Sequence, residues 1–252
     1  MLTRPVLLLA ALTSLGCRAK ERTSQEIARD ELAWTMQQHF HDTYVAWESV
    51  LANDLARAQA SGQRLVADVK VVLPDGTEAP PHNLGAALEA MAELHYAKDI
   101  PSAAHATARI GVACGSCHTT VRADVQLPKV EVPPAPDSSD LQAVMQHHRA
   151  STEAMWQALV MADDAALKAA ATQLSKAQLA PSGTSADSPV SPEATQLEVQ
   201  IHDIAARLSR STDAESRATA FGDLLTTCAS CHHLLKGGPG SKASVEGDAP
   251  AQ

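Results

Sequence analysis

Two short segments with one pattern, Cys114-Gly-Ser-Cys117-His118 and Cys228-Ala-Ser-Cys231-His232, decide how this chain is organised. In each, two cysteines stand three residues apart and a histidine follows directly. On a helical turn such cysteines face the same side, so both thiols can bond one porphyrin while the adjacent imidazole reaches its iron. C-x-x-C-H is the attachment motif of c-type haem. We expect two covalently bound haem c groups, with His118 and His232 as the proximal iron ligands.

Other uses of paired cysteines fit the sequence less well. A zinc site would draw on both pairs at once, whereas these pairs lie far apart and each has its own histidine. A thioredoxin-like redox pair would follow a strand, but both motifs end helical stretches. A disulfide within either pair would be strained. Haem attachment therefore accounts for four of the 5 cysteines and leaves Cys17.

The chain is a tandem repeat. Met36-Gln-Gln-His39 recurs as Met145-Gln-His-His148, and a tryptophan follows each copy, at positions 47 and 156. Because the two copies match with an offset that grows slowly along the chain, the pattern indicates a duplicated domain with small loop insertions. The predicted domains are residues 22–125 and 141–236, joined by a Pro-rich linker at 126–140. Residues 237–252 are rich in Gly, Ser and Pro, and we expect them to be disordered.

Each half is predicted to hold four helices, because Ala, Leu, Glu, Gln and Arg dominate and β-branched runs are scarce. Asp54, and Asp163 or Asp164, fit the N-cap of the second helix in each half. The fold class is therefore all-α: two tandem four-helix bundles, each with one c-type haem attached to its last helix. The predicted helices are 25–52, 54–67, 84–99, 102–124, 141–161, 163–179, 193–209 and 212–236. Only 3% of residues are aromatic, so two porphyrins would supply apolar bulk that side chains do not.

The amino terminus is predicted to be a lipoprotein-like signal peptide, residues 1–17. Arg4 precedes an apolar run at 5–15 that is too short to span a membrane and fits a secretory signal. Gly16-Cys17 resembles a bacterial lipoprotein processing site, with Ser14 where an aliphatic residue is usual. The alternative is an ordinary signal peptide cleaved elsewhere. We expect a lipid on Cys17 to anchor the exported protein at the periplasmic face of a bacterial membrane, inner or outer.

The sixth iron ligand of each haem is open to several residues. Met36 and His39 share a helical face at i and i+3, as do Met145 and His148, and both residue types ligate haem iron. His39 and His148 are the first candidates, with Met36 and Met145 as alternatives. Trp47 and Trp156 are expected to pack inside the bundles. Lower-ranked histidines without a counterpart are His95, His105 and His202, and those expected to be exposed are His41, His147 and His233.

A four-helix domain with its single C-x-x-C-H in the last helix resembles the class II c-type cytochromes, the cytochrome c-prime group. Residues 220–232, AFGDLLTTCASCH, look like that family's final helix, and Arg122 stands four residues after His118, as is usual there. Met36-Gln-Gln-His39-Phe40 resembles the family's first helix. The resemblance implies a first helix lying against the haem and, as in typical members, a five-coordinate iron behind an apolar residue. A tandem copy departs from the family's usual form.

These features together favour one-electron transfer between redox partner proteins of the cell envelope over enzymatic activity. The alternative is a haem-based protein that binds or senses nitric oxide or carbon monoxide at an open iron. A di-haem peroxidase is less favoured, because the known ones are larger and need an acid–base residue beside an open iron. The formal charge of −9 argues against a nucleic-acid partner.

Overall fold

The structure, a computed structural model, describes residues 23–67, 81–123, 125–135, 141–177 and 191–236. These residues form eight helices and no strand, which confirms the predicted all-α class. The first half of the chain holds α1 (Ser24–Leu51), α2 (Leu55–Ala67), α3 (Pro81–His95) and α4 (Ile100–Val121). The second half holds α5 (Leu141–Met161), α6 (Asp164–Lys176), α7 (Pro192–Leu208) and α8 (Ala214–Leu235). The predicted signal segment with Cys17 and the tail 237–252 lie outside the described residues.

Side-chain caps set the helix boundaries. Asp163 accepts a hydrogen bond of 2.9 Å from the Ala166 backbone N–H at the start of α6, as predicted. The sequence predicts a third helix that runs to Asp99, but α3 ends at His95, and Asp99 is instead the N-cap of α4. The Asp99 side chain accepts from the Ser102 backbone N–H at 2.8 Å, and the Ser102 side chain caps in return, so the two residues form a capping box.

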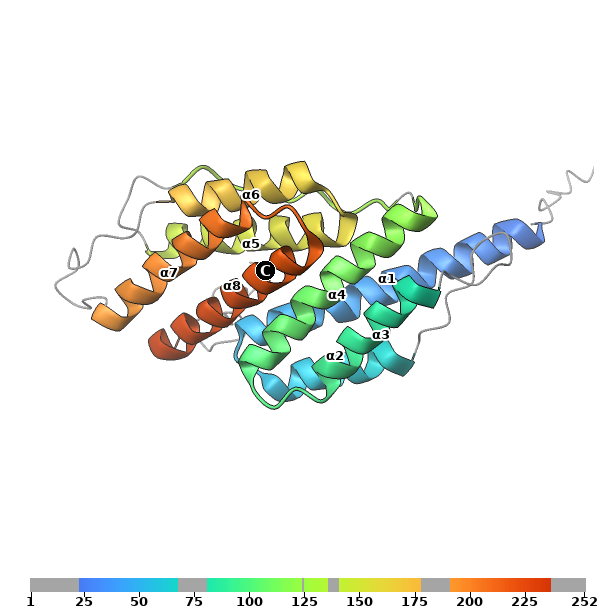
Figure 1. Ribbon diagram of the computed structural model, residues 1–252, viewed down its shortest axis with the longest axis horizontal. Coiled ribbons are helices and arrows are strands. Elements are labelled where there is room, and N and C mark those ends of the chain that lie inside the picture. Colours follow the sequence, from blue (N-terminus) through green and yellow to red (C-terminus); the bar gives the residue numbers. More distant parts are fainter. Residues whose placement is uncertain (1–22, 68–80, 124, 136–140, 178–190, 237–252) are drawn as a thin grey trace, which may run out of the picture.

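Two helices run through the middle of the molecule. Figure 1 shows α4 and α8 side by side, with α2 and α3 on one side and α5, α6 and α7 on the other. α4 also packs against α5, and α8 packs against α1, so both central helices touch both halves of the chain. Between the described helices α5 and α8, no pair of Cα atoms comes within 8 Å. Within the second half, α8 packs closely against α7, and α5 meets α8 through side chains.

Small residues allow the central helices to approach closely. A Cβ atom at Gly222 of α8 would lie 2.4 Å from the ring Nδ1 of His105 on α4, and one at Gly111 would lie 2.6 Å from the ring of Trp156. Trp47 and Trp156 are fully buried, as predicted. Trp156 stacks on Phe221 with ring centroids 6.2 Å apart. Full burial of a large apolar side chain is worth roughly 1.5–3 kcal/mol, so each of these rings contributes to the stability of the core.

The sequence repeat is also present in the backbone. Asn53, after α1, and Ala162, after α5, both adopt left-handed conformations, with φ of 57° and 52°. The next residues make matching bonds: the Asp54 N–H donates to the Ser49 carbonyl at 2.8 Å, and the Asp163 N–H donates to the Ala158 carbonyl at 2.9 Å. The two helical hairpins thus turn in the same way.

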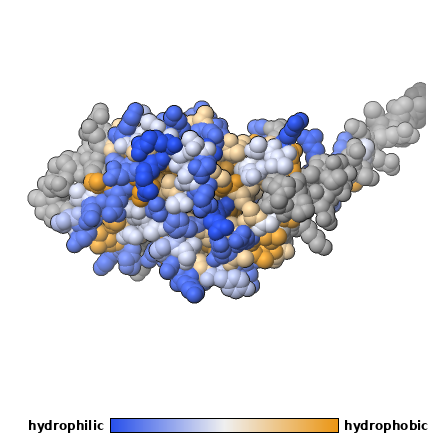
Figure 2. All heavy atoms as spheres, in the orientation of Figure 1, coloured by the Kyte–Doolittle hydropathy of each residue, from blue (hydrophilic) through white to orange (hydrophobic). Residues whose placement is uncertain are grey.

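The described surface is mostly polar. Figure 2 shows apolar residues gathered over the α2–α3 end of the visible face and over the carboxyl end of α8. At the carboxyl end of α8, Leu234 and Leu235 are 42% and 39% exposed, and His233 separates them from the second motif. Among the described helices, none combines the length and apolar character that crossing a membrane requires.

Candidate functional site

The two C-x-x-C-H motifs occupy equivalent places, in the last turns of α4 and α8. All four of their cysteines are free thiols. Cys228 and Cys231 are buried, each 7% exposed, whereas Cys114 and Cys117 are half-buried. The second motif therefore lies deeper in the protein than the first.

The thiols lie in surroundings that disfavour the thiolate. Burial raises the pKa of Cys114 and of Cys228 to about 12, and the second cysteine of each pair adds to the effect. Burial also raises the pKa of Cys117 and, together with the nearby Glu198 carboxylate, that of Cys231. Redox-active cysteine pairs depend on a lowered pKa. These apolar surroundings suit a covalent partner such as a porphyrin better than thiol–disulfide exchange.

Both motif histidines are held by a backbone carbonyl. His118 Nδ1 lies 2.8 Å from the Val160 carbonyl oxygen, and His232 Nδ1 lies 2.9 Å from the Leu51 carbonyl oxygen. Because a carbonyl can only accept, Nδ1 carries the proton in each ring and Nε2 keeps its lone pair. Metal-ligating histidines are oriented in this way. Burial also lowers the pKa of His118, with partial opposition from the Val160 bond, which favours the neutral ring.

Each carbonyl comes from the opposite half of the chain. Leu51 is the last residue of α1, and Val160 lies at the end of α5, the equivalent helix. The last carbonyls of a helix have no partner within it, and its carboxyl end carries partial negative charge, so both favour a donor such as Nδ1–H. The first half thus orients the second motif's histidine, and the second half orients the first motif's.

The structure separates the two histidines predicted as distal ligands. His148 on α5 is 7% exposed, and its Nε2 is buried without a hydrogen-bond partner. Burial, with the charges of His202, His147 and His232, lowers the pKa of His148 to about 3, so its ring is neutral. His39 on α1 is only half-buried, as are the alternative ligands Met36 and Met145.

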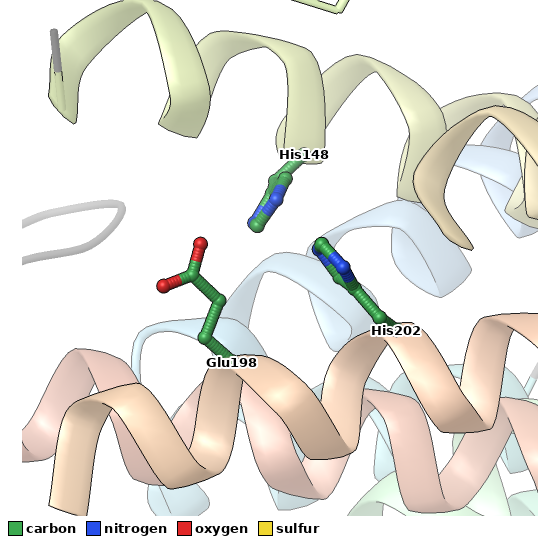
Figure 3. A group of neighbouring side chains, drawn as sticks. All are labelled: His148, Glu198 and His202. Carbon is green, nitrogen blue, oxygen red and sulfur yellow. The ribbon is translucent and has the colours of Figure 1, made fainter. Parts of the chain in front are cut away.

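A second histidine joins His148. His202 of α7, ranked lower from the sequence, lies with its ring centroid 5.8 Å from that of His148, and its Nε2 is also buried without a partner. Glu198, one turn earlier on α7, points at the same place, and ligand atoms of the three side chains all lie within 4.8 Å of one another (Figure 3). The i, i+4 spacing of Glu198 and His202 was the available sequence signal, but it does not show which helix faces them.

The other histidines are engaged elsewhere or exposed. The expectation that His147 is exposed was wrong: it is 2% exposed and its Nδ1 donates to the Pro133 carbonyl at 2.8 Å, because the segment after α4 passes over α5. His41 and His233 are exposed, as predicted. His105 lies 3.4 Å from Asp223, and His95 contacts Tyr96.

The first half has different residues where α7 carries Glu198 and His202. Buried Ala87, Ala90, Met91 and Leu94 of α3 match buried Ile201, Ile204, Ala205 and Leu208 of α7 at the same offset that separates Cys114 from Cys228. At that offset, the first half has Leu84 at the position of Glu198 and Leu88 at the position of His202. The two sites are therefore chemically different, one with two leucines and the other with a carboxylate and an imidazole.

The residues present fit a c-type haem at each motif. Each offers two sheltered thiols and an imidazole whose Nε2 is free to ligate iron. In addition, the indole Nε1 atoms of Trp47 and Trp156, at equivalent positions, are buried without an acceptor. A buried unpaired polar group costs roughly 1–3 kcal/mol, so such groups call for a partner, which porphyrin carboxylates could supply. Neither the family models, the curated proteins nor the solved structures with which the chain was compared gave a match.

Proposed function

We propose that the chain is a di-haem c-type cytochrome that transfers single electrons in the bacterial cell envelope. The observation that carries this proposal is the matched pair of bonds from His118 to the Val160 carbonyl and from His232 to the Leu51 carbonyl. These bonds fix the tautomer that an axial haem ligand requires, directly beside paired thiols. When bound, each haem supplies an iron that changes its oxidation state by one electron.

The residues of the chain attach, orient and shelter the cofactors. We assign one haem-binding four-helix bundle to each half, residues 22–125 and 141–236, with thioether bonds from the cysteines of α4 and α8. His148 takes the distal position in the second site, because its Nε2 is buried and unpartnered. In the first site His39 and Met36 are the candidates, and Met145 remains the alternative to His148.

The packing of α4 against α8 supports electron transfer within the chain. These two helices carry both attachment motifs and lie side by side (Figure 1). Because the first motif is half-buried and the second is buried, we assign contact with redox partner proteins to the first haem. The formal charge of −9 favours partners with basic surfaces.

A lipid on Cys17 is the proposed link to the periplasmic face of a membrane. A chain extends by at most about 3.3–3.6 Å per residue. The short stretch between Cys17 and Ser24 therefore keeps the start of α1 near the lipid surface. Two acyl chains anchor a protein stably without a spanning helix.

Binding of nitric oxide or carbon monoxide is the second candidate function, and one observation favours it for the first site. Leu84 and Leu88 stand where the second site has Glu198 and His202, and an apolar distal face is typical of an open iron. Carbon monoxide added to the reduced protein tests this. A shifted Soret band at one haem would support gas binding, and an unchanged spectrum would leave electron transfer as the single function.

Spectroelectrochemical titration of the purified holoprotein tests the main proposal. We expect two reversible one-electron transitions in the haem absorption bands. The Cys114→Ala/Cys117→Ala variant should lose one transition, and the Cys228→Ala/Cys231→Ala variant should lose the other. A chain without redox-active absorption, or with both transitions intact in either variant, would contradict the proposal.

A further inference from the structure

The second site contains polar groups that attaching a haem does not require. His148 of α5 is buried, and Glu198 and His202 of α7 converge on it, as Figure 3 shows. Two of the three side chains present a buried imidazole nitrogen without a hydrogen-bond partner. Burying such groups is costly unless something in the site uses them.

This cluster belongs to the second attachment motif. α7, which carries Glu198 and His202, packs against α8, and Leu197 and Gln200 of α7 line one pocket together with Ser230 and His233 at the motif. In agreement with this packing, burial and the Glu198 carboxylate raise the pKa of the Cys231 thiol. Three helices therefore meet there: α8 with the motif, α5 with His148, and α7 with Glu198 and His202. The Glu198 carboxylate lies within 4.8 Å of the candidate distal ligand, His148.

The first half offers no such carboxylate at the matched positions. Leu84 and Leu88 replace Glu198 and His202, while His39 remains the counterpart of His148. Two otherwise similar motifs are thus placed beside different charges. Since a nearby anion stabilises the more positive, oxidised state of an iron, the two sites should differ in reduction potential.

We propose that Glu198 and His202 are positioning residues that hold the His148 ring in the second site and set the reduction potential of the second haem below that of the first. This inference rests on the proposed function. With both haems bound, this difference would give electron flow a direction: one electron would pass from the iron of the second haem, which would be oxidised, to the iron of the first, which would be reduced. No other reactant takes part in that exchange.

Potentiometric titration of the holoprotein, followed by haem absorbance, tests the proposal. The native chain should show two separate transitions. In Glu198→Gln, which keeps the shape and removes the charge, the lower transition should move upward and the gap should narrow. Glu193→Gln is the matched control, because Glu193 is an exposed carboxylate on the same helix. It should leave both transitions in place.

A shift in Glu198→Gln no larger than that in Glu193→Gln would overturn the positioning role. In that case the proposed function would remain supported if the same samples, assayed for haem content, still carried two covalent haems. A native chain that carries no covalent haem would instead remove the proposed function itself. The two failures are therefore distinguishable.

His202→Leu introduces the residue found at the matched position of the first half and separates positioning from ligation. If His202 positions His148, near-infrared magnetic circular dichroism of the oxidised variant should keep both haems' axial ligation while one potential shifts. Conversion of one haem to a high-spin spectrum would identify His202 as the ligand and overturn the proposal.

Discussion

At the scale of single residues, the tautomer and the orientation of each motif histidine are set by a hydrogen bond from its Nδ1 to a backbone carbonyl. The bonds of 2.8 Å and 2.9 Å leave Nε2 of His118 and His232 as the lone-pair nitrogen. A hydrogen bond at Nδ1 also makes an imidazole a more basic ligand. Val160 and Leu51, which are far from these motifs in sequence, therefore orient the motif histidines through their backbone carbonyls alone.

The distal position gives a prediction at this scale. Replacing His148 with Ala should remove the sixth ligand of one haem, because no other group bonds its buried Nε2. Near-infrared magnetic circular dichroism of the oxidised holoprotein should then lose the bis-histidine band of one haem and gain a high-spin signal. The exposed His41→Ala serves as the control. A spectrum of His148→Ala identical to the native one would contradict the assignment.

At the scale of helices, the ends of α4 and α5 meet through a glycine. A Cβ atom at Gly115 would lie 2.2 Å from the Leu159 carbonyl oxygen, which is backbone and cannot swing aside. Gly115→Ala should therefore push the helix ends apart, lengthen the His118–Val160 bond and lower the free energy of unfolding by roughly 1–3 kcal/mol. Urea denaturation measures the loss, and resonance Raman of the first haem's iron–histidine bond reports the change at His118.

Gly85→Ala is the matched control for Gly115, because a Cβ atom there would meet nothing within 4 Å. On the exposed face of α3 it should raise the free energy of unfolding by about 0.5–1 kcal/mol through helix propensity. Equal effects of the two substitutions would show that the α4 and α5 ends are not in close contact.

The cap of α4 gives a pH-dependent prediction. Hydrogen bonds from Ser102 hold the pKa of Asp99 below its ordinary value. The cap's contribution is therefore present above the ordinary pKa of aspartate and is lost as the pH falls through the lowered value in the folded protein. Asp99→Ala should lower the Tm by a few degrees at neutral pH, by an amount that shrinks in acid, whereas Asp99→Asn should keep the cap. Differential scanning calorimetry at neutral and acid pH checks both.

The helices were predictable from the sequence because their causes are local. Composition, caps such as Asp163 and the repeat placed all eight within a few residues. The expected end of the third helix at Asp99 was wrong, because Asp99 caps the next helix by accepting from the Ser102 backbone N–H. The meeting of His148 with His202, and of His232 with Leu51, could not be predicted. Those pairs depend on how α5, α7 and α1 pack, which the periodicity of one helix does not specify.

At the scale of the whole molecule, the two halves depend on each other. α4 and α8 each touch helices of both halves, and each half supplies the carbonyl that orients the other's motif histidine. Side chains add to the link: Tyr44 on α1 donates to Glu153 on α5 at 3.2 Å. The two halves therefore pack against each other, and each helps to orient the other's motif histidine.

The anchor gives a prediction at the same scale. The full-length Cys17→Ser chain, expressed in a bacterium with its lipoprotein and haem-maturation systems, should lose its lipid. It should then either move from the membrane fraction to the soluble periplasmic fraction or stay unprocessed. Haem absorption per chain and immunoblots of the fractions measure this, with Ser14→Ala as a control that keeps the cysteine. A native chain already found in the soluble fraction would contradict lipid anchoring.

Covalent haem content per chain tests the central claim most directly. Intact-mass spectrometry and the pyridine haemochrome assay of the purified mature protein should both give two haems per chain. One should be lost in Cys114→Ala/Cys117→Ala and the other in Cys228→Ala/Cys231→Ala. A native chain with the bare polypeptide mass, or one that keeps both haems when either cysteine pair is removed, would contradict the account.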